Sequence, residues 1–230
     1  MEKPALSLSD VTFAWPGKGG FSLSCPAFTV AQGERVLLLG ASGSGKSTLL
    51  SLICGIVAAE SGQVSVAGTE LGSLSAGQRD RFRGEAIGVI FQQFNLLPYA
   101  SVADNILLPL SFAPKRRDRA EGAMEAEALC RALDLPDGIM DQRAERLSVG
   151  QQQRVAVARA LIGAPPLIVA DEPASALDAS TQERFLDLMF AQVAQAGSSL
   201  LMVSHDARLG ARFDRVVEID NILQAQKVAV

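Results

Sequence analysis

The chain has 230 residues, of which 48% are hydrophobic and 20% charged; this balance excludes global disorder and supplies a large core. The net charge of −4 argues against a dedicated nucleic-acid-binding protein, because such proteins usually carry a basic excess. The 3 cysteines are too scattered for a disulfide framework or a zinc site, which indicates reduced, buried thiols in a reducing compartment.

The length suits one domain, with or without a small subdomain. The first residues lead directly into a strand pattern, without the apolar segment of a secretory signal peptide. No apolar run approaches the roughly 18 residues that a membrane helix needs. We therefore expect a soluble chain that is cytosolic or faces the cytosol.

The N-terminal part of the chain has the alternating pattern of β-strands, separated by Gly- and Pro-containing turns. Strands are predicted over residues 6–13, 21–23, 28–30 and 36–39. After a helix that ends near Gly55, where a glycine suits the C-terminal cap, residues 62–68 alternate again. These segments predict a small antiparallel β region around a parallel core.

The remainder of the chain alternates strands and helices. Strands are predicted over residues 86–91, 167–170, 199–204 and 215–219, and helices over residues 148–161 and 181–195. Residues 102–135 are helical in composition, but prolines and the basic cluster Lys115-Arg116-Arg117 interrupt them, and we interpret this cluster as a solvated helix start. The alternation predicts a doubly wound α/β fold, with ligands at the carboxyl ends of its parallel strands.

A glycine-rich segment, Gly40-Ala41-Ser42-Gly43-Ser44-Gly45-Lys46-Ser47-Thr48, lies between a predicted strand and a predicted helix. In that context its spacing predicts a phosphate-binding loop rather than a plain Gly/Ser-rich turn. Its three glycines permit positive φ, so that backbone N–H groups can converge on an anion. Lys46 supplies a mobile charge for the β- and γ-phosphates, and the Ser47 hydroxyl can bind Mg²⁺. The loop predicts binding of a nucleoside triphosphate.

Two adjacent carboxylates, Asp171 and Glu172, follow the predicted strand at residues 167–170. At the strand's carboxyl end we expect them at the same sheet edge as the phosphate loop. One carboxylate there can hold the Mg²⁺ shell, and its neighbour can accept a proton from water that attacks the γ-phosphate. The alternative is an acidic helix N-terminus, which the apolar strand and the phosphate loop make the weaker interpretation.

The third motif is Leu147-Ser148-Val149-Gly150-Gln151-Gln152-Gln153-Arg154, in which Ser148 is predicted to cap a helix. Capping alone does not explain Gly150-Gln151. The segment resembles the signature motif of ATP-binding-cassette (ABC) ATPases, and Lys46, Ser148 and Asp171 occur in that family's order. The resemblance extends over residues 6–219.

The resemblance implies the ABC ATPase fold: a RecA-like P-loop NTPase core with a mainly parallel sheet, an antiparallel β subdomain and a helical subdomain. It implies a single domain over residues 1–230, with the helical subdomain inserted at about residues 95–162. It also implies ATP and Mg²⁺ as cofactors. The implied ATP-binding residues of the loop are Gly40, Ser42, Gly43, Ser44, Gly45, Lys46, Ser47 and Thr48.

Further site residues follow only from the resemblance. Trp15 resembles the aromatic residue that stacks on adenine, with a partly buried aromatic of the β region as the alternative. Gln92 resembles the glutamine that contacts Mg²⁺ and the attacking water, and Gln93 is the competing choice. His205, the single histidine, resembles the switch histidine that contacts the γ-phosphate. Asp171, Ser47 and Gln92 are the implied metal-binding residues, and Glu172 is the implied base.

Residues that act on a second copy also follow from the resemblance. Ser148, Gly150 and Gln151 are implied to contact the ATP of the partner, and Ser175, Ala176, Leu177 and Asp178 resemble the loop at the dimer interface. The family commonly has glycine at the position of Val149, which puts the local geometry in question without removing the contacts of Ser148 and Gly150. The segment after Asp220-Asn221 also departs from the family, and we assign it no role.

The implied function is ATP binding and hydrolysis by a head-to-tail dimer that drives a separate integral membrane permease from the cytoplasmic face of the membrane. Residues 91–98 and 147–154 look most like the macrolide-export and lipoprotein-release branch. One alternative is a soluble ABC ATPase that acts on nucleic acid or ribosomes, although a second cassette, a coiled-coil insertion and zinc cysteines are missing. The other is a non-hydrolysing nucleotide-gated binding module, which would be expected to lack Glu172 or His205.

Overall fold

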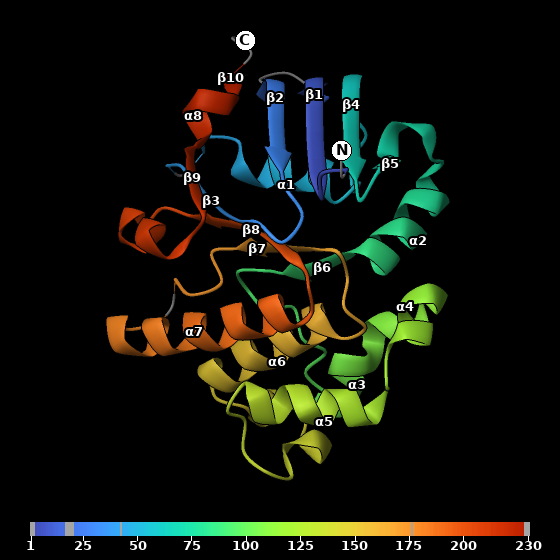
Figure 1. Cartoon of the computed structure of the whole chain (residues 1–230), viewed down its shortest axis with the longest axis vertical. Coiled ribbons are helices and arrows are strands. Elements are labelled where there is room, and N and C mark those ends of the chain that lie inside the picture. Colours follow the sequence, from blue (N-terminus) through green and yellow to red (C-terminus); the bar gives the residue numbers. More distant parts are fainter. Residues whose placement is uncertain (1–2, 17–20, 42, 176, 228–230) are drawn as a thin grey trace. The chain divides into compact units, whose positions relative to one another are not determined.

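A computed structural model describes residues 3–16, 21–41, 43–175 and 177–227 of the chain (Figure 1). The chain divides into two compact units, which are described separately. Unit 1 comprises Met1–Arg83 and Ser199–Val230, and unit 2 comprises Gly84–Ser198. The single domain with a helical insertion at about residues 95–162 stays a prediction.

Unit 1 contains an antiparallel sheet with the strand order β10-β2-β1-β4-β5. Its strands are β1 (Leu6–Ala14), β2 (Phe21–Val30), β4 (Ser61–Val66), β5 (Thr69–Glu70) and β10 (Gln224–Lys227). Central strand β1 pairs antiparallel with both β2 and β4. Leu6, Leu8, Val11 and Phe13 are buried along β1, so the hydrophobic pattern located this sheet correctly. Strand β10, which the sequence did not reveal, pairs with residues 21–24 of β2.

Unit 1 also contains parallel strands. Strand β3 (Arg35–Leu39) lies between β8 (Ser199–Ser204) and β9 (Arg215–Glu218) and runs parallel to both. Every residue of β8 is buried, as expected for a strand of a parallel sheet that is covered on both faces. The helices here are α1 (Lys46–Ile53), the 3-10 helices η1 (Leu71–Ser73) and η5 (Ala207–Arg212), and α8 (Ile219–Ile222). Helix α2 (Ala76–Ala86), which the sequence also did not reveal, contains the division between the units.

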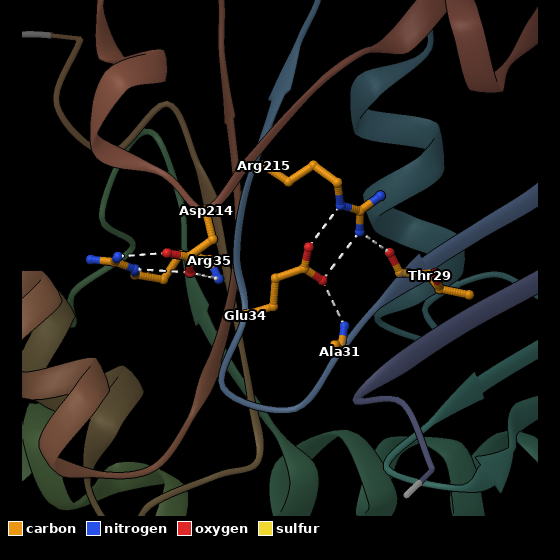
Figure 2. Close-up of polar contacts among 6 residues, drawn as sticks. All are labelled: Thr29, Ala31, Glu34, Arg35, Asp214 and Arg215. Carbon is orange, nitrogen blue, oxygen red and sulfur yellow. Dashed lines mark hydrogen bonds and ion pairs between the residues drawn. The ribbon is translucent and has the colours of Figure 1, made fainter. Parts of the chain in front are cut away.

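Charged side chains join the β2–β3 turn to the start of β9 (Figure 2). Arg215 Nε donates to Glu34 Oε1 over 2.7 Å, and Arg215 also donates to the Thr29 carbonyl. Arg35 donates to both carboxylate oxygens of Asp214, over 2.7 and 3.2 Å. The hydrogen bonds from Arg35 lower the pKa of Asp214. Burial opposes ionisation of Glu34, but the hydrogen bonds from Arg215 and the Ala31 N–H outweigh it and lower the pKa.

Unit 2 is mainly helical and includes two parallel strands, β6 (Ile87–Ile90) and β7 (Leu167–Asp171). Its helices are α3 (Val102–Leu107), α4 (Pro114–Arg119), α5 (Ala123–Ala132), α6 (Val149–Leu161) and α7 (Ala179–Gln195), with 3-10 helices η2 (Leu108–Ser111), η3 (Ile139–Asp141) and η4 (Ala144–Arg146). Helices α5, α6 and α7 contact one another (Figure 1). Helix α6 packs so closely on β6 that a Cβ on Gly88 would lie 2.2 Å from the Ala160 carbonyl oxygen.

The interpretation of residues 115–117 as a solvated helix start is wrong for Arg116, which is only 2% exposed. Its guanidinium donates to backbone carbonyls, including those of Ile162 at 2.6 Å and Ala160 at 2.7 Å near the end of α6. Burial lowers the pKa of Arg116 to about 10. Lys115 and Arg117 are exposed as predicted, so one turn of helix α4 directs its charged side chains both inward and outward.

None of the helices in the described parts of the chain has the length and apolar character required to cross a bilayer.

Candidate active site

The glycine-rich loop runs from the end of β3 into α1, as the sequence predicted. Gly43 and Gly45 have φ values of +82° and +97°, which L side chains rarely adopt. Gly40 does not have positive φ and is needed for a different reason. A Cβ there would lie 2.5 Å from Ile219 Cγ2, so only glycine leaves room for this side chain.

Lys46 is the first residue of α1 and is only 9% exposed. Its ammonium group donates to the carbonyls of Gly40 and Ala41, each at 2.7 Å, so the two ends of the loop are fixed to each other. The Ser44 hydroxyl is buried and has no hydrogen-bond partner within the described parts of the chain, whereas Ser47 is exposed. Ser42 lies outside the described residues. A buried, unsatisfied hydroxyl beside a lysine and a helix N-terminus fits a loop built around an anion.

Trp15 lies beside this loop. Its indole N–H donates to the Thr48 hydroxyl over 3.1 Å, and its ring meets that of Phe13 edge to face, with the centroids 5.0 Å apart. The Trp15 side chain is 42% exposed, so an apolar ring face remains accessible next to the phosphate loop. This arrangement is compatible with stacking on a base, which stays a prediction.

His205 directly follows the buried strand β8 and is exposed. The preceding residue, Ser204, accepts a hydrogen bond from the Gly40 N–H over 3.3 Å, so His205 follows a residue that contacts the start of the phosphate loop. Unit 1 thus brings together Trp15, the loop and the end of β8, three segments that are far apart in the sequence.

In unit 2, Asp171 ends strand β7, and Glu172 and Pro173 follow it. Glu172 has a φ of +45°, in the left-handed region that costs energy for a residue with a side chain. The Ser175 N–H and hydroxyl both donate to the Glu172 carbonyl, over 3.3 and 3.1 Å, and close this turn.

The predicted dimer-interface loop continues from that turn into α7. Ala176 lies outside the described residues, and Leu177 is half-buried. Asp178 caps α7 by accepting from the Thr181 N–H over 3.0 Å. Hydrogen bonds from the Ser180 hydroxyl and from Thr181 lower the pKa of Asp178 to about 2.

Helix α6 begins at the predicted signature segment. The Ser148 hydroxyl accepts from the Gln151 N–H over 3.3 Å, and Gln151 Oε1 accepts from the Ser148 N–H over 2.9 Å, which is a reciprocal capping box. A Cβ on Gly150 would meet no atom within 4 Å apart from its chain neighbours, and Val149 is 55% exposed. Ser148 is exposed as well, so its hydroxyl is accessible at the start of α6.

Gln92 and Gln93 form a turn after β6, and both are exposed. The next two residues, Phe94 and Asn95, have φ values of +55° and +49°. The geometry does not distinguish the two glutamines, so the preference for Gln92 stays a prediction.

Sequence reasoning missed three buried polar residues that support these loops. Asn105 is fully buried and exchanges hydrogen bonds with the backbone of Leu97, at 2.7 and 3.1 Å. Gln153 and Arg159 of α6 are also buried and donate to backbone carbonyls of the loops after β7 and β6. The available signal was Arg159 inside the apolar run at residues 155–162, where a charge has to find buried acceptors.

The chemistry of the site lies in oxygen donors and phosphate-binding groups. No cluster of three or more His, Cys, Asp or Glu side chains suited to a metal ion occurs in the part of the chain that the structure describes. The predicted Mg²⁺-binding residues are a hydroxyl, an amide and one carboxylate, which are hard oxygen donors. Such a set suits Mg²⁺, which usually keeps several of its water ligands and binds through a few protein oxygens and the phosphates of a nucleotide.

Comparisons with known proteins agree with this arrangement. The ABC transporter family profile matches residues 23–175. YbbA of Escherichia coli (strain K12), an ABC transporter ATP-binding protein, is 39% identical over 192 residues, which are 84% of this chain and 83% of YbbA. LolD of Anaeromyxobacter dehalogenans (strain 2CP-C), a lipoprotein-releasing system ATP-binding protein, is 42% identical over 191 residues, 83% of this chain and 79% of LolD.

A longer relative matches only in part. MacB of Rhodopirellula baltica, a macrolide export ATP-binding/permease protein, is 39% identical over 199 residues, which are 86% of this chain but 29% of MacB. The chain therefore spans less than a third of that relative.

A solved structure has the same fold over its whole length. The ATP-binding cassette MJ0796, solved as a dimer in a post-hydrolysis state with ADP and Pi, superposes with a TM-score of 0.80 at 30% identity, over 98% of this chain and 99% of that one. The chain belongs to the ABC transporter family and is an ABC ATPase. The family and fold predicted from the sequence are confirmed.

Proposed function

We propose that this chain is the ATP-hydrolysing subunit of a transporter of the macrolide-export or lipoprotein-release type, and that it works as a head-to-tail dimer on a separate membrane permease. The observation that carries the proposal is the phosphate loop, in which Lys46 is held by two loop carbonyls beside a buried, unsatisfied Ser44 hydroxyl. The similarity to LolD and MacB supports the choice of transporter type.

In the proposed binding step, the N–H groups of residues 40–48 and the N-terminus of α1 bind the β- and γ-phosphates of ATP, with Gly40, Ser42, Gly43, Ser44, Gly45 and Thr48 shaping the loop. Lys46 exchanges at least one loop carbonyl for a phosphate oxygen. Trp15 stacks on the adenine. Ser47, Asp171 and Gln92 would hold Mg²⁺, which would supply positive charge to neutralise the phosphates.

In the proposed hydrolytic step, Glu172 accepts a proton from the water that attacks the γ-phosphate. Gln92 orients that water, and His205 donates a hydrogen bond to a γ-phosphate oxygen. The left-handed backbone of Glu172 supports this assignment, because strained conformations concentrate at functional sites.

The proposed site is completed by a second copy of the chain. Ser148, Gly150 and Gln151 at the start of α6 contact the γ-phosphate of the partner's ATP, where an exposed hydroxyl and the positive end of a helix are suited to an anion. Ser175, Ala176, Leu177 and Asp178 lie at the proposed dimer interface. The dimeric state of MJ0796 supports this arrangement.

We place the permease contact on unit 2 and the chain on the cytoplasmic face of the membrane. Tyr99 and Phe112, which precede and follow α3 in the chain, are 70% and 69% exposed, and Phe91 next to Gln92 is 38% exposed. Large exposed apolar side chains are typical of protein interfaces. No nucleic-acid partner is proposed, in keeping with the acidic net charge.

The proposal is tested by steady-state ATPase assays of the wild type and Glu172→Gln. We expect kcat to fall by at least about 100-fold in Glu172→Gln, because amide nitrogen cannot accept the proton, while ATP binding is retained. Glu127→Gln, on the exposed surface of α5, is the matched control and keeps wild-type turnover. Wild-type turnover by Glu172→Gln would contradict the assignment of the base, and an inactive wild-type protein would contradict hydrolysis itself.

A further inference from the structure

Helix α6 contains two polar side chains that are almost fully buried. Gln153 is 1% exposed and Arg159 is 8% exposed, and both lie on the helix that begins at Ser148. Neither belongs to the set of residues that the proposed function uses. Each donates hydrogen bonds to a loop that follows one of the two strands of unit 2.

Gln153 reaches the loop after β7. Its Nε2 donates to the carbonyl of Pro173, the residue directly after Glu172. Glu172 has positive φ, and its own carbonyl accepts two hydrogen bonds from Ser175. Ser175 therefore holds the strained residue within the loop, and Gln153 holds the next residue, Pro173, from the helix.

Arg159 reaches the loop after β6. Its Nη1 donates to the Asn95 carbonyl over 2.6 Å, and its Nη2 donates to the Phe94 carbonyl. These are the two consecutive left-handed residues that follow Gln92 and Gln93. A planar guanidinium fork matches two neighbouring carbonyls, so it holds a backbone conformation that would otherwise relax.

We infer that Gln153 and Arg159 are positioning residues for ATP hydrolysis, through which α6 fixes the loops of Glu172 and Gln92 in the chain that also presents Ser148. The inference rests on the proposed function. One helix then presents a phosphate contact to the ATP of a second copy and holds the catalytic loops that act on the ATP of its own copy, so one rigid element links the two ATP sites of the dimer. A shift of about 1 Å in a catalytic group is sufficient to cost roughly 100-fold in rate.

Gln153→Met tests the loop of Glu172, because methionine keeps the length of the side chain and removes the donor. We expect kcat for ATP to fall by at least about tenfold, while KM and the affinity for a fluorescent ATP analogue stay within about threefold. Gln195→Met is the matched control, because Gln195 is an exposed glutamine of unit 2 at the end of α7, outside the loops of Glu172 and Gln92. We expect this variant to keep kcat within about twofold of wild type.

Arg159→Lys tests the loop of Gln92, and it also tests the positioning role of α6 if Gln153→Met does not fold. Lysine keeps the charge but lacks the planar fork, so we expect an intermediate fall in kcat with unchanged analogue affinity. The inference is overturned if the folded variants keep kcat within about twofold of wild type, or if kcat and nucleotide affinity fall in parallel. Wild-type turnover is therefore measured first. An inactive wild-type protein would contradict the proposed function, whereas an active wild type with unaffected variants would contradict only the positioning role of Gln153 and Arg159.

Discussion

Replacing Arg116 by methionine should destabilise unit 2, because the guanidinium is the donor for carbonyls at the end of α6. Three of its acceptors, the carbonyls of Arg159, Ala160 and Ile162, lie in buried surroundings at 3.2, 2.7 and 2.6 Å. Leaving each without a donor costs about 2 kcal/mol, or roughly 6 kcal/mol together. The variant also removes a buried positive charge, which lowers the free energy of the folded state and offsets part of this cost.

The free energy gained by removing this buried charge can be bounded from the pKa of Arg116, which burial lowers by about 2.5 from its ordinary value, to about 10. At about 1.4 kcal/mol for each pKa unit, this lowering disfavours the charged form by roughly 3.5 kcal/mol. The difference leaves an expected loss of about 2.5 kcal/mol in the free energy of unfolding.

Urea unfolding followed by circular dichroism measures this loss as a lower midpoint with an unchanged slope. Arg117→Met removes the same charge from the exposed face of α4 and should change the free energy of unfolding by less than about 0.5 kcal/mol. Arg116→Lys, which keeps the charge with fewer donors, should fall between the two. A loss below about 1 kcal/mol in Arg116→Met would refute the reasoning that the carbonyls depend on this side chain.

Three further predictions concern unit 1. Gly45→Ala should weaken ATP binding by more than about tenfold in a titration, because φ is +97° and the new Cβ would lie 2.8 Å from the Phe21 ring; binding within twofold would contradict this. Trp15→Ala should raise the Kd for ATP by about five- to tenfold through loss of stacking, with the affinity for triphosphate alone unchanged. Asp214→Asn should lose less stability than the wild type when the pH is lowered. Arg35 lowers the pKa of Asp214 in the folded protein, so the ion pair stabilises the fold fully above the ordinary pKa of about 4. The wild type loses this stabilisation as the pH falls through the lower pKa of the folded state, whereas the variant has none to lose. Parallel acid-unfolding curves for Asp214→Asn and the wild type would exclude this contribution.

Features with a local signal were predictable from the sequence. Ser148 was predicted to cap a helix, and α6 begins directly after it; the residues of the capping box, Ser148 and Gln151, are only three apart in the chain. Strand β8 has the predicted bounds because an apolar run of that length between polar turns is typical of a buried strand. The phosphate loop likewise depends on neighbours in the chain, and its helix begins at Lys46 and is followed by Gly55 with positive φ.

Features that depend on distant residues were not predictable. The sequence around Arg116 predicts a solvated residue, because the carbonyls at the end of α6 that bind its guanidinium are more than 40 residues away in the chain. Gly40 reads as a position that needs positive φ, whereas its actual constraint is the side chain of Ile219. Strand β10 has no hydrophobic periodicity of its own and is defined by pairing with β2. The left-handed φ of Glu172 likewise has no signature in the sequence, because Ser175 holds it and Gln153 holds the residue after it.

The contact between Gly40 and Ile219 has a consequence for biosynthesis. A ribosome releases the segment at residues 40–48 early, but the side chains against it include Ile219, and β3 pairs with β8 and β9 from the last part of the chain. Contacts of such large sequence separation form late, since the intervening chain has to be closed first. A nascent chain arrested before about residue 199 would contain every residue of the phosphate loop without the strands that shape it. Nucleotide affinity should therefore be gained only after β8 and β9 have been synthesised and pair with β3.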